Sequence, residues 1–133
     1  MKLSLLGTIA LGIATLVTVV PVSAHHSFSA EYDSKKVVTL TGTVTKVEWM
    51  NPHVYFYVDV TGEDGKVSNW AFEMGPPNGL QRSGWTRNTM KIGDEVIVNG
   101  TLAKDGSKQV NARTVTTADG QKLGAASSEG KGN

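Results

Sequence analysis

Alternating apolar and polar residues dominate this chain from about residue 37 onward. In the segment 53–60 one parity is wholly apolar and the other is polar or aromatic, beginning with His53. The apolar positions are Val54, Phe56, Val58 and Val60. A period of two with one apolar face predicts a half-buried β-strand.

The segment 37–49 predicts a longer first strand with a change of phase. In its first half one set of apolar residues falls on even-numbered positions, and in its second half another set falls on odd-numbered positions. The two sets are Val38, Leu40, Gly42 and Val44, followed by Val47 and Trp49. Such a switch indicates a β-bulge or a strong coil, and Gly42 is the expected bend.

The remaining pattern predicts three more strands, a hairpin turn and a short helix. The strands are expected at 66–73, 95–101 and 109–117, the turn at 62–65 and the helix at 78–84. Three strands, a short helical connection and two further strands follow the order of an OB-like five-stranded barrel. We therefore expect an all-β fold with one short helix, and the alternative is a small open β-sandwich.

The N-terminus has the pattern of an export signal. Lys2 precedes an apolar stretch over 3–20, and small residues at Val22 and Ala24 fit a cleavage site. The expected signal peptide is 1–24, cut after Ala24, which places the mature protein in the periplasm. The stretch is nearly long enough to span a membrane, so an uncleaved anchor is the competing interpretation.

The mature chain divides into an N-terminal arm over 25–36, an OB-like β domain over 37–123 and a disordered tail over 124–133. The tail is expected to be disordered because it is rich in Gly, Ser and Ala. Lys2 is one of 13 basic residues, so its removal leaves the charge balanced against 12 acidic ones. This balance argues against nucleic acid as a partner, and the absence of cysteine excludes thiol catalysis and cysteine-ligated metals.

Two of the three histidines directly follow the expected cleavage site. If the mature chain begins at His25, its α-amine and imidazole together form a chelate that suits Cu(II), which heads the divalent affinity order. His26 and His53 are further candidate ligands, and His53 lies in the turn between the first two strands. The sequence thus predicts a copper site of His25, His26 and His53, whereas histidines without a metal role are the alternative.

No enzymatic signature is present, so a non-enzyme is favoured. Glu48, Asp59 and Glu73 define no acid–base pair by their spacing, and we expect them at the surface. The alternative to copper binding is a non-catalytic OB-like module that binds a small molecule, a glycan or a protein partner.

Several short motifs resemble a family of small exported Gram-negative bacterial proteins that is classified as a domain of unknown function. The motifs include His25-His26-Ser27-Phe28, Trp49-Met50-Asn51-Pro52-His53 and Gly84-Trp85-Thr86. The resemblance covers essentially the whole mature chain. It implies a periplasmic, mainly β domain and brings no established activity.

Overall fold

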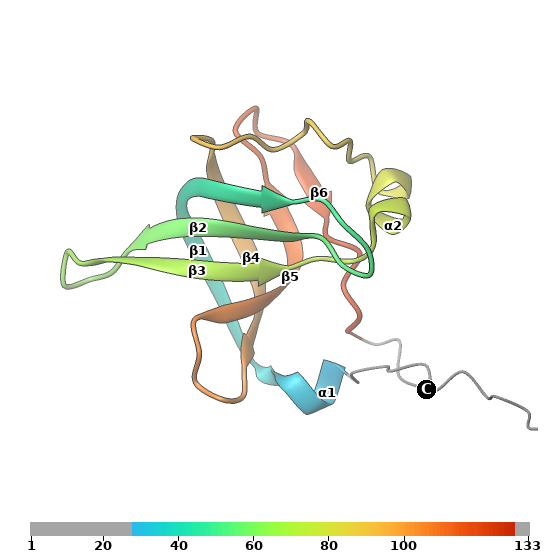
Figure 1. Cartoon of the computed structure of the whole chain (residues 1–133). Helices are drawn as coiled ribbons and strands as arrows, with labels where there is room; N and C mark the ends of the chain where they lie inside the picture. The colour runs from blue at the N-terminus through green and yellow to red at the C-terminus, as the bar shows by residue number, and fades with distance from the viewer. Residues whose placement is uncertain (1–27, 130–133) are drawn as a thin grey trace, which may run out of the picture.

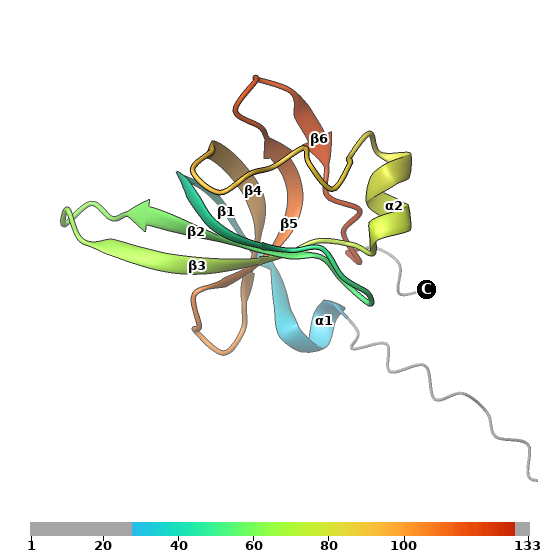
Figure 2. The ribbon, with the colours of Figure 1, turned by 45° about the horizontal axis from the view of Figure 1, so that its top comes forward.

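The computed structural model describes residues 28–129, whose strands form one mostly antiparallel sheet that closes on itself (Figures 1 and 2). Its elements are α1 (Phe28–Glu31), β1 (Tyr32–Glu48), β2 (Tyr55–Thr61), β3 (Val67–Glu73), α2 (Pro77–Arg82), β4 (Glu95–Ala103), β5 (Gln109–Thr116) and β6 (Lys122–Gly124). The strand order is β3-β2-β1-β4-β5-β6, and a parallel pairing of β3 with β5 closes a ring of five strands. The all-β prediction is confirmed, with two short helices instead of one.

Strand β1 is long enough to pair with two neighbours, β4 along its first part and β2 along its second. Its register with β2 shifts between Val44 and Lys46, so the predicted change of phase occurs at Thr45. Gly42 has a different role from the expected bend. A Cβ at Gly42 would lie 2.1 Å from the carbonyl oxygen of Asp59, so β2 crosses there at a distance that only glycine permits.

The core lies inside the ring and follows the predicted alternation. Phe56 and Phe72 face each other across β2 and β3, with ring centroids 5.0 Å apart and nearly parallel planes. The four apolar positions of the segment 53–60 are all buried, as the period of two requires. Leu80 of α2 and the following Trp85 are also buried against this core.

Helix α1 lies beside the β4–β5 loop, away from α2 (Figures 1 and 2). The backbone N–H of Lys104, in that loop, donates to the Glu31 carbonyl at 2.8 Å. The expected arm over 25–36 is therefore structured from Phe28 onward, and Tyr32 is only 2% exposed. Sequence patterning missed α1 because one helical turn has no measurable period.

The expected disordered tail also differs from the structure over residues 124–129. Ala125 is fully buried, and its carbonyl accepts a hydrogen bond from the Gly75 N–H at 2.8 Å. Glu129 forms an ion pair with Arg113 on β5. The segment therefore packs along the sheet after β6. The expected signal peptide and residues 130–133 lie outside the described residues.

Candidate functional site

His53 lies in the loop between β1 and β2, two residues before β2 begins. Its side chain is 34% exposed, so the imidazole is partly open to solvent. His25 and His26, the other two predicted ligands, lie outside the described residues. The structure thus shows where one of the three histidines lies, and the metal role of all three stays a prediction.

The buried edge of His53 meets the carboxylate of Glu73. His53 Nδ1 and Glu73 Oε1 are 2.5 Å apart, a short contact between the ring and the carboxylate. Glu73 ends β3 opposite Tyr55, and His53 lies in the loop two residues before Tyr55. The hairpin register therefore brings the imidazole and the carboxylate together.

Glu73 is buried, with 4% of its surface exposed, which corrects the expectation of a surface carboxylate. Its second oxygen accepts a hydrogen bond from the Tyr32 hydroxyl at 2.6 Å. The side-chain amide of Gln109 donates to the Tyr32 oxygen at 2.8 Å. No buried side-chain nitrogen or oxygen of the described residues lacks a partner, so this polar network is fully satisfied.

The network also changes the acidity of two tyrosines. Burial, and then the hydrogen bond to Glu73, raise the pKa of Tyr32 well above its usual value. Burial and the charge of Glu73, with a smaller contribution from Glu31, raise the pKa of Tyr55 in the same direction. Both phenols therefore remain protonated at neutral pH and act as hydrogen-bond donors.

The contact with Glu73 fixes which nitrogen of His53 is available. When Nδ1–H donates to the carboxylate, Nε2 carries the lone pair, and the ring as a whole is partly exposed. A carboxylate behind an imidazole is the usual second partner of a metal-binding histidine, because it fixes the tautomer and the orientation of the ring. Within residues 28–129, however, no three side chains from His, Cys, Asp and Glu gather to hold a metal.

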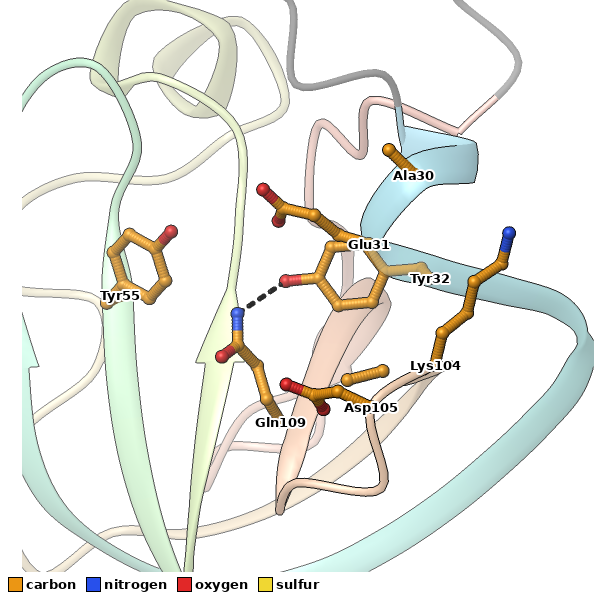
Figure 3. A pocket seen from close by; sticks show the side chains of 8 residues that line it. Ala30, Glu31, Tyr32, Tyr55, Lys104, Asp105 and Gln109 are labelled. Carbon is orange, nitrogen blue, oxygen red and sulfur yellow. Dashed lines mark hydrogen bonds between the residues drawn. The ribbon is translucent and has the colours of Figure 1, made fainter.

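A pocket of about 590 Å³ opens beside this network, between α1, β2 and the β4–β5 loop (Figure 3). Its lining residues are Ala30, Glu31, Tyr32, Tyr55, Ala103, Lys104, Asp105 and Gln109. Figure 3 shows the Tyr32 hydroxyl at the bond with Gln109, with Glu31 and Tyr55 extending toward the same space. Tyr32 thus lines the pocket and also bonds the carboxylate of the His53–Glu73 pair.

Sequence reasoning missed Glu73, Tyr32 and Gln109 as members of a site. The signal for Glu73 was available, because the hairpin turn at 62–65 fixes which residues of β2 and β3 face each other. Tyr32 and Gln109 join the site only through the strand ring, and no local pattern indicates that contact.

No helix among residues 28–129 is long and apolar enough to cross a membrane. A comparison with curated proteins finds no match to the chain. The pattern of a family of unknown function, DUF6152, matches residues 14–112, which include most of the ring and both members of the His53–Glu73 pair. The chain therefore belongs to this family of unknown function.

Proposed function

We propose that the protein is exported to the periplasm and there binds Cu(II) through its mature N-terminal histidine, with His53 as a further ligand. The observation that carries the proposal is the contact of His53 Nδ1 with the buried Glu73 carboxylate at 2.5 Å. It orients the imidazole and leaves Nε2, on a partly exposed ring, as the nitrogen that can bind the metal.

The position of Phe28 supports an approach of the proposed N-terminal ligand, His25, to His53. The ring of Phe28, the first described residue, stacks on Tyr32 with centroids 5.5 Å apart. Tyr32 in turn bonds to Glu73, which contacts His53. Phe28 is therefore linked to His53 through Tyr32 and Glu73. Three peptide units join the α-carbons of His25 and Phe28, a span of at most about 11 Å.

The donor set fits copper chemically. The amine and imidazole of His25, with the Nε2 atom of His53, offer three nitrogen ligands, a set that Cu(II) prefers among divalent ions. His26 offers another imidazole and is the alternative third ligand. Because no described cluster of side chains completes a metal site around His53, the proposal requires the N-terminal donors.

The test is a Cu(II) titration of protein processed on export, with its start at His25 verified by mass spectrometry. We expect one tight equivalent, with a nitrogen pattern in the electron paramagnetic resonance spectrum. One extra residue before His25 should abolish tight binding, and His53→Ala should weaken it. Weak binding that is indifferent to both changes would refute the copper proposal.

A second pair of variants separates orientation of His53 from general stability. Glu73→Gln removes the charge behind the imidazole and should weaken Cu(II) binding by about 10- to 100-fold, as loss of a second partner usually does. Glu48→Gln is the matched control, because Glu48 is a half-buried strand carboxylate that bonds Tyr57 and Lys46. Equal affinities of the two variants would show that the carboxylate behind His53 has no role in binding.

A second candidate function is the non-catalytic binding of a small molecule, a glycan or a protein partner. The pocket between α1, β2 and the β4–β5 loop favours it. Its volume of about 590 Å³ lies within the range of small-molecule sites. OB-like domains also bind ligands through their loops and strand faces.

A further inference from the structure

We propose that the pocket binds a small organic amine in its ammonium form. The inference rests on the second candidate function, small-molecule binding, and does not depend on copper. Residues from α1, β1, β2, the β4–β5 loop and β5 converge on this cavity, which adjoins the described start of the chain (Figure 3). Its shape and its distribution of charge both bear on the class of ligand.

One tyrosine gives the pocket its exposed aromatic surface, and a second closes one side of it. Tyr32 is held in place by its bonds to Glu73 and Gln109, stacks on Phe28 and is only 2% exposed, so it borders the cavity mainly through its hydroxyl. Tyr55 lies on β2, across the space from Tyr32 (Figure 3). Aromatic faces attract cations through their quadrupole, and an apolar ligand body packs against them equally well.

The charges of the lining residues favour a cation. Glu31 and Asp105 are acidic, and the buried Glu73 carboxylate lies directly behind the Tyr32 hydroxyl. Lys104 is the cationic side chain among the lining residues, and its ammonium group donates to the Ser29 carbonyl. An anionic ligand would therefore meet more negative than positive charge, whereas an ammonium ion would be attracted.

Asp105 is an acidic lining residue whose position is fixed by the β4–β5 turn. Its Oδ1 accepts the backbone N–H of Ser107 at 2.9 Å in the tight β4–β5 turn. The hydrogen bonds from Ser107 lower the pKa of Asp105, so the carboxylate is charged at neutral pH. Gln109 adds an amide oxygen, because its nitrogen is the atom bonded to Tyr32. An ammonium group, which has only donors, matches these acceptors.

The experiment compares two ligands that share a shape and differ in charge, benzylamine and benzyl alcohol. Binding is followed at pH 7 by ¹⁵N NMR of the metal-free exported protein, with the side-chain amide of Gln109 as the local reporter. We expect benzylamine to bind at least about tenfold more tightly than benzyl alcohol, and added salt to reduce the difference. N-acetylglucosamine tests the competing glycan ligand.

Asp105→Asn should weaken benzylamine binding by about three- to tenfold and leave benzyl alcohol unchanged. Asp119→Asn is the matched control, because Asp119 also accepts a backbone N–H, from Gln121, in a tight turn away from the pocket. Because the protein in this experiment is metal-free, binding of benzylamine separates this site from the copper proposal. Equal binding of the two ligands, binding of the sugar alone, or no shift at Gln109 would each overturn the amine proposal.

Discussion

Removal of the Tyr32 hydroxyl tests the network most directly. Tyr32→Phe deletes one oxygen and keeps the ring, so the stack on Phe28 and the burial of the side chain remain. Two hydrogen bonds disappear, one to the Glu73 carboxylate at 2.6 Å and one from Gln109 at 2.8 Å. The change therefore isolates hydrogen bonding from packing.

The expected loss follows from burial at both ends of the bond to Glu73. Tyr32 is 2% exposed and Glu73 is 4% exposed, so water cannot readily replace the missing hydroxyl. A hydrogen bond to a charged group contributes about 1.5–3 kcal/mol, and a buried acceptor left without its donor adds a cost of similar size. We expect Tyr32→Phe to lower the free energy of unfolding by about 2–3 kcal/mol.

The assay is urea unfolding followed by tryptophan fluorescence, with Tyr57→Phe as the control. The Tyr57 hydroxyl reaches Glu48 at a long 3.4 Å and is only half-buried, so its loss should cost less than about 0.5 kcal/mol. A double-mutant cycle with Glu73→Gln then measures the coupling between Tyr32 and Glu73. Equal unfolding free energies for the two phenylalanine variants would refute this account of the network.

Two further predictions concern alkaline pH and one strand crossing. Burial, and then Glu73, raise the pKa of Tyr32 above its usual 10.0, so the unfolded chain loses this proton first and stability falls above about pH 10. The decline reaches about 1.4 kcal/mol per pH unit from this group, and unfolding curves of Tyr32→Phe should show a shallower decline; an unchanged slope would contradict the assignment. At the crossing, Gly42→Ala places a Cβ 2.1 Å from the Asp59 carbonyl oxygen and should destabilise by about 2–3 kcal/mol. Gly124→Ala meets open space in another strand, so equal melting temperatures for the two alanine variants would contradict the close-approach argument.

The strands were predictable wherever one face is buried and the other is not. Strand β2 satisfies this condition along its whole length, and its inward and outward residues were assigned correctly. In β1 the phase change was foreseen, but its place was not, because Thr45 carries no mark of a bulge in the sequence. Strand β6 has three residues, and a period of two cannot be recognised over so short a segment.

The candidate site was only partly predictable, for a similar reason. His53 was identified from its residue type and its place in the turn, and parity put it on the outward face of the second strand. Glu73 is buried next to Tyr32, the first residue of β1. The Tyr32 hydroxyl donates a hydrogen bond to the Glu73 carboxylate. The sequence separation between Tyr32 and Glu73 is 41 residues, so the contact follows from closure of the ring.

The buried carboxylate of Glu73 bears on whether His53 has a purely structural role. Taking a carboxylate out of water is costly even when it is well paired, and apolar residues of similar size usually stabilise a protein as much or more. Stability alone therefore gives little reason for an acidic residue at this end of β3. Orientation of the imidazole does give one, because Glu73 contacts Nδ1 and holds a ring that is partly exposed. Tyr32 bonds the same carboxylate and also stacks on Phe28, so helix α1 and the loop that carries His53 are linked through one buried network.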